Sequence, residues 1–191
     1  MRRVLEALGL VLLGVVLGLG SVAAVAFTIA APFEERFGPW RGTGIVGRVP
    51  AGPWERVATA TRGLVGLPRS ETIYLEARAD EDGRAFEPGC VYRFAGPALP
   101  ARWWSLTPYD AGWELLPNPD GVYSVGSHNA TLDANGRFSL RMHASAAGPA
   151  ELPLDDEPGT WVVLRLYHPD AGVAGRLGEI EWPRIQRESC P

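Results

Sequence analysis

Residues able to carry chemistry are dispersed along this chain instead of being grouped in motifs. None of the three histidines, His128, His143 and His168, has the spacing of a zinc motif such as H-E-x-x-H. The cysteines form no C-x-x-C pair, and no serine stands in a G-x-S-x-G turn. We therefore predict no metal centre, no catalytic residue and no cofactor.

Three acidic stretches are better explained by turns and loops than by sites. Residues 80–83 and 133–136 resemble the start of a calcium loop, but both lack the further oxygen ligands and the distal glutamate. Because Asp, Asn and Gly tolerate the dihedral angles of tight turns, we interpret both stretches as hairpin turns. Residues 155–157 are flanked by proline and glycine, which favours a solvated loop over a pair of acid–base carboxylates.

Aromatic side chains are denser than catalytic candidates in the middle of the chain. Trp103 and Trp104 are adjacent, so on a strand they point to opposite faces of the sheet. Packing in the core is the favoured interpretation of these aromatic residues. The alternative is an aromatic platform for an apolar or sugar ligand, with Tyr109, Trp113 and Tyr123 nearby in the sequence. Its candidate binding residues are Arg102, Trp104, Tyr109, Asn118, Tyr123 and Ser124.

The N-terminal segment is predicted to hold the rest of the chain at a membrane. Residues 8–31 form a charge-free apolar run of about two dozen residues, long enough to cross a bilayer as one helix. Arg2 and Arg3 precede this run and a net acidic flank follows it. The positive-inside rule therefore places the N-terminus in the cytoplasm and the remainder outside.

A cleaved signal peptide is the alternative interpretation of the same segment. Residues 24–26 resemble an A-x-A cleavage site. However, the apolar run continues past this point and exceeds the usual length of a signal-peptide core, which favours an uncleaved anchor. Both interpretations place the remainder of the chain outside the cytoplasm.

The composition excludes several functions and indicates a bacterial source. All 18 basic residues are arginine, so lysine Schiff-base chemistry, pyridoxal phosphate attachment and a P-loop are excluded. A net charge of -4 gives no electrostatic footprint for nucleic acid. A chain rich in Ala, Gly, Pro and Arg is typical of GC-rich bacterial codons. We therefore predict a single-pass protein of the bacterial inner membrane with a periplasmic domain.

Turn residues and hydrophobic periods divide the chain beyond this anchor, residues 1–31. Glycines and Pro39 predict an extended tether over residues 32–52, and Pro53 opens one short helix that extends to residue 65. Beyond residue 68 the apolar period changes to two, as in strands. The predicted strands are 72–78, 90–94, 102–109, 121–125, 138–143, 161–167 and 180–185. Residues 53–191 are thus predicted to be a mainly β, antiparallel sandwich domain with one short helix.

Cys90 and Cys190 are the two cysteines of the chain. An oxidising compartment permits a disulfide, and closing so long a loop contributes roughly 4–5 kcal/mol in the chain-entropy model. The sequence does not show whether the two residues are close in space. A disulfide and a free C-terminal thiol both remain open at this point.

Several blocks of sequence together resemble the bacterial family named domain of unknown function 1214. The most extensive are RWWSLTPYD at 102–110 and LRLYHP at 164–169, with shorter matches at 38–40, 71–75 and 118–125. The resemblance implies a jelly-roll-like β-sandwich. It also implies a separate envelope protein that carries a companion domain as a partner. It assigns no activity, and therefore no catalytic residue.

The chain departs from the family pattern at two places, Gly121-Val122 and Ala150-Glu151, which implies that any family pocket is altered here. The first functional hypothesis is a non-enzymatic module that binds a partner protein or a ligand outside the cytoplasm. The second is a surface enzyme acting on a glycan or lipid-linked substrate with the polar groups of the candidate residues. A purely structural envelope protein is the third.

Overall fold

The computed structural model describes residues 2–28, 34–43, 47, 50–53, 56, 67–118, 120–146, 148 and 150–191. The chain forms two compact units. One contains the N-terminal helix. The other consists of Glu35–Gly42 and Leu67–Pro191 and contains two β-sheets, and we call it the β unit.

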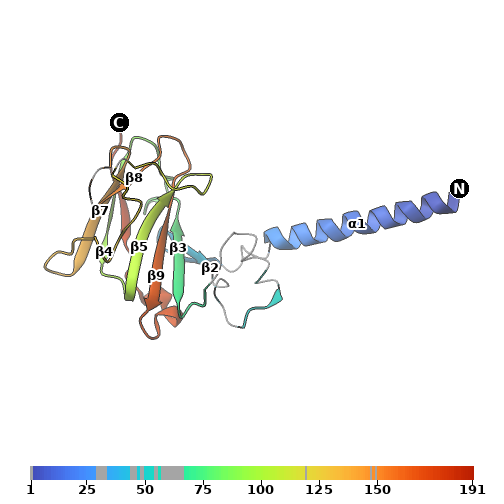
Figure 1. Cartoon of the computed structure of the whole chain (residues 1–191), viewed down its shortest axis with the longest axis horizontal. Coiled ribbons are helices and arrows are strands. Elements are labelled where there is room, and N and C mark those ends of the chain that lie inside the picture. The colour runs from blue at the N-terminus through green and yellow to red at the C-terminus, as the bar shows by residue number, and fades with distance from the viewer. Residues whose placement is uncertain are drawn as a thin grey trace. The chain divides into compact units, whose positions relative to one another are not determined.

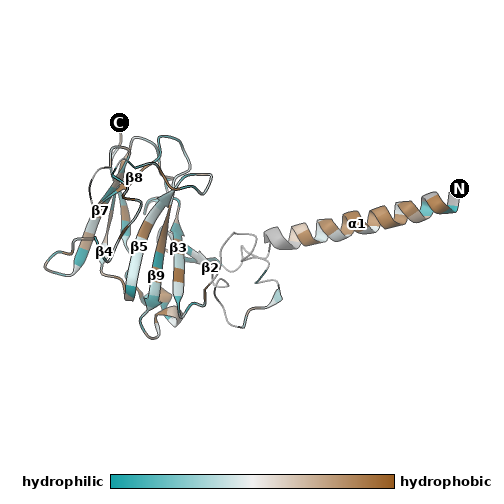
Figure 2. Cartoon of the chain, in the orientation of Figure 1, coloured by the Kyte–Doolittle hydropathy of each residue, from teal (hydrophilic) through white to brown (hydrophobic). Residues whose placement is uncertain are grey.

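Helix α1 (Arg2–Thr28) is long and apolar enough to cross a membrane. Its segment Glu6–Ala24 has a mean hydropathy of 2.4, and none of that segment is buried. Figure 2 shows hydrophobic residues along most of its length. The structure therefore confirms an N-terminal helix that is long and apolar enough to cross a membrane, and the crossing itself stays a prediction. Because signal sequences share these properties, retention of the segment after export stays a prediction.

The larger sheet has six strands, and the strand predicted at 161–167 lies in its middle. The order is β1-β2-β3-β9-β5-β6, with antiparallel pairing of β3 and β5 to the central β9 (Figure 1). The bounds are β1 (Glu34–Phe37), β2 (Trp40–Thr43), β3 (Thr72–Ala77), β5 (Ala101–Tyr109), β6 (Val125–Gly126) and β9 (Trp161–Pro169).

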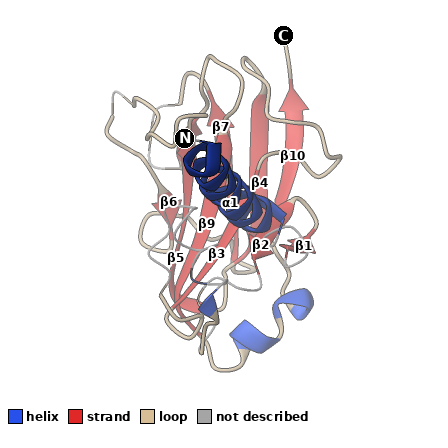
Figure 3. Cartoon of the chain, turned by 90° about the vertical axis from the view of Figure 1, so that its right-hand side faces the viewer, coloured by secondary structure: helices blue, strands red, loops and turns tan. Residues whose placement is uncertain are grey.

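The smaller sheet has four strands in the order β10-β4-β7-β8, and Figure 3 shows β10 beside β4. The bounds are β4 (Val91–Pro97), β7 (Arg137–His143), β8 (Glu151–Pro153) and β10 (Arg184–Ser189). The last strand, predicted at 180–185, lies at the edge of this sheet. It begins after Pro183, later than predicted, because a proline nitrogen has no hydrogen to donate to a ladder. β8 pairs in parallel with β7, a pairing that the sequence did not predict.

The core lies between the two sheets and follows the predicted alternation. On β3 the buried side chains are Ile73, Leu75 and Ala77, and on β7 they are Phe138, Leu140 and Met142. Each fully buried Leu or Phe stabilises the fold by about 1.5–3 kcal/mol. The mainly β fold with a preceding apolar helix is confirmed. The jelly-roll topology implied by the family resemblance stays a prediction.

A hairpin lies within the segment predicted to be an extended tether. β1 and β2 are joined by a turn at Gly38, whose φ of 60° favours glycine, and Trp40 is completely buried. The Trp40 indole donates a hydrogen bond of 2.7 Å to the carbonyl oxygen of Pro183. The core therefore extends to residues that the sequence pattern had placed outside the sandwich.

Other differences concern short elements. The predicted helix at 53–65 lies outside the described residues except for Pro53 and Arg56, which are both helical. The predicted strand 121–125 is wrong over most of its length, because Gly121 has a φ of 67° in a turn closed onto Asn118. Two short 3-10 helices, Val173–Gly175 and Leu177–Glu179, were not predicted.

Candidate functional site

The outer face of the six-stranded sheet, turned away from the smaller sheet, carries aromatic and arginine side chains. We define it by the side chains of β3, β9 and β5 that alternate with the core residues. Strand register places Tyr74 beside Arg165, and Trp103 beside Tyr167. These residues come from segments far apart in the sequence, and only the pairing of the strands makes them neighbours.

Three rings at one end of this face form the aromatic cluster, which we define as Tyr109, Trp113 and Trp161. The Tyr109 and Trp161 rings stack with centroids 5.2 Å apart, and Trp113 meets Trp161 edge-on at 4.5 Å. The guanidinium of Arg78 lies 4.8 Å from the Trp161 ring centroid, within cation–π distance. Trp161 is 4% exposed whereas Trp113 is 52% exposed. The Trp113 indole therefore faces solvent and packs on the buried Trp161 ring.

The turn that carries Trp113 holds it in a conformation that large residues rarely adopt. Trp113 has a φ of 71°, and its backbone N–H donates to the carbonyl oxygen of Asp110. The Asp110 carboxylate accepts the N–H of Glu114 at 2.8 Å, and the Trp161 indole donates to the Asp110 carbonyl oxygen at 2.8 Å. Left-handed backbone at a non-glycine residue costs on the order of 1–3 kcal/mol and recurs at ligand-binding sites.

Packing against a second loop supports this turn. A Cβ atom built at Gly159 would lie 2.8 Å from the Cβ of Ala111, closer than real carbon contacts allow. Gly159 also has a φ of 117°, a region that favours glycine. The β8–β9 loop therefore approaches the turn too closely for any residue larger than glycine at position 159. This close packing supports the turn that carries Trp113.

Arg165 lies in the middle of the outer face and contacts the aromatic cluster. Its guanidinium donates to the Thr107 hydroxyl at 3.0 Å and to the Tyr109 hydroxyl at 2.7 Å, and it lies 5.5 Å from the Tyr109 ring centroid. Burial raises the pKa of the neighbouring Tyr74, with a further contribution from Tyr167. Tyr74 is thus a neutral hydrogen-bonding group at physiological pH.

A second set of rings lies further along the same face. Trp103 packs on Tyr167 with centroids 5.1 Å apart, and it stacks on the exposed His128 at 6.0 Å. The outer face therefore has aromatic surface at both ends and an arginine between them. Such a surface is suited to binding a flat, hydroxylated ligand by stacking and hydrogen bonds, rather than to covalent chemistry.

The structure does not bring the six sequence-predicted binding residues together. Tyr109 belongs to the aromatic cluster, but Trp104 is 2% exposed and packs on Phe138 between the sheets, with ring centroids 4.6 Å apart. Its neighbour Trp103 is the one that faces outward. Arg102 is exposed near the start of β5, the opposite end of that strand from Tyr109.

The other three predicted residues lie in the β5–β6 connection. The Asn118 amide donates to the Val122 carbonyl oxygen and accepts the N–H of Asp120, so its side chain shapes a turn. The Ser124 carbonyl oxygen accepts a hydrogen bond from Asn129, and Tyr123 is exposed. Among the described residues, none of the three forms a hydrogen bond or a ring contact with the aromatic cluster.

Sequence reasoning missed the three residues that complete the site, Arg78, Trp161 and Arg165. They lie on or directly after β3 and β9, and short-range patterns do not show which strands pair. One signal was present: Arg165 is the charged exception within an otherwise apolar central strand. A charged side chain in an otherwise apolar strand is expected to lie on the face away from the core and to contact other groups there.

The predicted hairpin turns at 80–83 and 133–136 are confirmed. The Asp80 carboxylate accepts the N–H groups of Asp82 and Arg84, and the Asp133 carboxylate accepts those of Asn135 and Arg137. Because these oxygens bind the backbone of their own turns, the two stretches are built as turns rather than as calcium loops.

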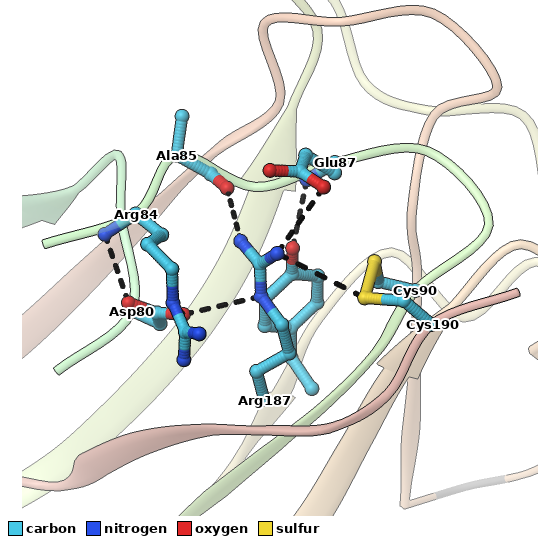
Figure 4. The surroundings of a disulfide bond; sticks show 8 residues. Asp80, Arg84, Ala85, Glu87, Cys90, Arg187 and Cys190 are labelled. Carbon is cyan, nitrogen blue, oxygen red and sulfur yellow. Dashed lines mark hydrogen bonds and ion pairs between the residues drawn. A yellow bond between two sulfur atoms is a disulfide. The ribbon is translucent and has the colours of Figure 1, made fainter. Parts of the chain in front are cut away.

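A charged cluster surrounds a disulfide at the edge of the smaller sheet, where β4 begins and β10 ends (Figure 4). Cys90 and Cys190 are joined, which decides the alternative that the sequence left open. Glu87 lies close to both sulfur atoms, but disulfide sulfurs are not the thiolates that bind metals. Arg187 contacts Asp80 at 3.2 Å and Glu87 at 3.1 Å, so this cluster fastens the β3–β4 loop to β10.

Comparisons with known proteins find one family and related folds. A family model described as "Protein of unknown function (DUF1214)" matches residues 71–171. The structure is similar to that of the VPA0106 protein from Vibrio parahaemolyticus, with a TM-score of 0.62 and 23% sequence identity. That match covers 73% of this chain but 36% of the Vibrio chain, so the chain corresponds to roughly a third of the longer protein.

A second similar structure is a putative uncharacterized protein from Burkholderia cenocepacia, with a TM-score of 0.43, 12% identity, and coverage of 86% of this chain and 38% of that one. The Vibrio structure supports the fold alone, because its identity to this chain is low. None of the curated proteins compared with the chain matches it.

Proposed function

The chain belongs to the DUF1214 family, and from that premise we propose that it is a membrane-anchored binding module that takes a glycan on the outer face of its six-stranded sheet. One observation carries this proposal. The half-exposed Trp113 is held at a positive φ against the buried Trp161, with Arg78 over the Trp161 ring. Backbone strain that presents a large apolar ring to water is typical of a ligand contact.

The proposed location is the outer surface of a bacterial inner membrane. Helix α1 supplies the anchor, and Arg2 and Arg3 favour a cytoplasmic N-terminus. The Cys90–Cys190 disulfide supports an oxidising compartment, because such bonds rarely persist in the cytosol. On this proposal the β unit faces the periplasm and meets envelope glycans there.

We also propose a protein partner, an envelope protein that carries a companion domain. The support is that this chain corresponds to about a third of the longer Vibrio protein. Cross-linking of the full chain in intact cells, followed by mass spectrometry, is expected to recover a protein similar to the remaining part of that longer chain. Repeated recovery of this chain alone would contradict the partner.

The enzyme hypothesis loses its geometric support in this structure. It required the polar groups of Arg102, Tyr109 and Asn118, with those of two further residues, to converge beside an aromatic wall. Within the described residues they lie at opposite ends of β5 and in a separate loop. We therefore propose binding without catalysis.

Replacing Trp113 with alanine is expected to weaken glycan binding about tenfold or more, because exposed aromatic anchors carry much of the energy at binding sites. The measurement is a titration of the full-length protein in detergent, followed by tryptophan fluorescence. The probes are tetramers of glucose, N-acetylglucosamine and galacturonic acid.

The matched control is Leu132→Ala, which removes an exposed apolar side chain from the β6–β7 connection. We expect this variant to bind like the unmodified protein. Failure of every tetramer to bind saturably, or equal binding by the Trp113→Ala variant, would contradict the proposed function.

A further inference from the structure

Arg165 is a half-buried arginine with no acidic partner among the described residues, whereas Arg102, which also forms no ion pair, is exposed to solvent. The Arg165 side chain lies in the centre of the outer face. Arginines of the same unit that do pair with a carboxylate within 4.0 Å are Arg69, Arg78, Arg84, Arg93, Arg137, Arg141, Arg176, Arg184 and Arg187.

The groups that Arg165 contacts are neutral. Its two hydrogen bonds go to the hydroxyls of Thr107 and Tyr109, and these use two of the five N–H donors of a guanidinium. Partial burial of a cation is costly unless an opposite charge compensates it. The described part of the chain supplies hydroxyls here and no carboxylate, so the missing negative charge is expected to come from a ligand.

Other charged groups on the outer face do not supply the negative charge that would compensate Arg165. Glu76, one pleat along β3 from Tyr74, pairs with Arg78 at 3.5 Å. Tyr74, directly beside Arg165 in the ladder, has a raised pKa because of burial and stays neutral. The centre of the outer face is therefore positive in a protein whose formal net charge is -4.

We propose that Arg165 binds the carboxylate of an acidic glycan lying along the outer face. This inference rests on the proposed function and names its ligand class. The aromatic cluster and Trp103 contact the sugar rings, while the free N–H donors of Arg165 bind a uronic acid carboxylate between them. Charge-assisted hydrogen bonds of this kind are short and directional.

The register of the strands sets the length of such a ligand. The Arg165 row lies two residues from the Trp103–Tyr167 pair and four residues from the Tyr109–Trp161 pair. At about 3.3 Å per residue, these separations are roughly 7 and 13 Å. An oligosaccharide of several rings is needed to contact both ends, whereas a single sugar reaches one end and Arg165.

The test compares tetragalacturonate with its methyl ester, which has the same rings and no charge. Both are titrated into the full-length protein in detergent at low and high salt. The acid is expected to bind about tenfold more tightly than the ester at low salt, because its carboxylate gains a charge-assisted bond. In the Arg165→Gln variant this preference should disappear while binding of the ester stays within about twofold, and Arg165→Lys should retain part of the preference.

The control is Arg102→Gln, which removes an exposed arginine near the start of β5, the strand that pairs with β9. This variant is expected to keep the preference for the acid. If Arg165 only supported the structure, the Arg165→Gln variant would bind the acid and the ester more weakly by the same factor. That result overturns the inference. If acid and ester bind equally, and Trp113→Ala weakens both, the inference fails while the proposed function stands. If neither form binds, nor any neutral tetramer, both fail.

Discussion

Replacing Cys190 with serine is expected to lower the free energy of unfolding of the β unit by about 4–5 kcal/mol. The disulfide joins residues separated by 100 positions, and in the chain-entropy model a loop of that length contributes at the upper end of the usual range. Typical domains are stable by about 5–15 kcal/mol, so this loss is a large fraction of the total. The measurement is urea unfolding of the full-length protein in detergent, followed by tryptophan fluorescence.

Cys190 is the better residue to change because it is exposed near the C-terminus, whereas Cys90 is buried in the core. Serine at position 90 would add the cost of burying a hydroxyl to that of losing the bond. Reductant should lower the urea midpoint of the unmodified protein to that of Cys190→Ser and leave the variant unchanged. An unmodified protein that is insensitive to reductant would contradict the prediction.

Replacing Asp80 with alanine is expected to destabilise the β unit by about 3 kcal/mol, the second large effect. Asp80 is 1% exposed, and its carboxylate contacts both Arg84 and Arg187 at 3.2 Å. Removing one partner of a buried ion pair costs about 3–5 kcal/mol, because the remaining charge loses its compensation. We place the effect at the low end because Arg84 is about half exposed. Urea unfolding under the conditions given above measures it.

Asp133 offers a matched control for this change. It accepts the same pattern of backbone N–H groups in an equivalent turn, but its carboxylate is exposed. Asp133→Ala should cost about 1 kcal/mol, the contribution of turn hydrogen bonds alone. Asp80→Asn, which keeps the hydrogen-bonding shape and removes the charge, should fall between the two alanine variants. Equal effects at 80 and 133 would show that the contacts with Arg84 and Arg187 add no stability.

Figure 4 shows why these two effects concern the same part of the fold. Arg187 on β10 contacts Asp80 and the Ala85 carbonyl oxygen, and the disulfide joins the residue after β10 to the residue before β4. Because these groups are neighbours, their contributions are not expected to add independently. The double variant Asp80→Ala/Cys190→Ser measures the coupling directly.

Local patterns in the sequence were enough to predict the strands at 72–78, 138–143 and 161–167 and the Asp-containing turns. The period-two alternation at 72–78 and 138–143 placed the correct side chains in the core, since neighbouring side chains on a strand point to opposite faces. The Asp-containing turns were recognised from residues that are close in the chain. The apolar N-terminal helix followed from its length and composition. Each of these features depends on interactions within a few residues.

The candidate site depended on contacts that no local pattern contains. Alternation showed that Trp103 and Trp104 face opposite ways, but only packing between the two sheets decided that Trp104 lies inside. The contact of Arg165 with Tyr109 spans 56 residues and exists because β9 pairs with β5. The same holds for Trp40 in the core and for the disulfide.

The amino-acid sequence by itself thus determined the apolar helix, the strands at 72–78, 138–143 and 161–167 and the alternation of their side chains, because these follow from backbone periodicity and local solvation. The tertiary structure alone decided which strands are neighbours, which rings meet at Trp161, and that the half-buried Arg165 has no carboxylate partner among the described residues. Those outcomes arise when two sheets bury their apolar faces together, and that global packing sets the register across segments far apart in the chain.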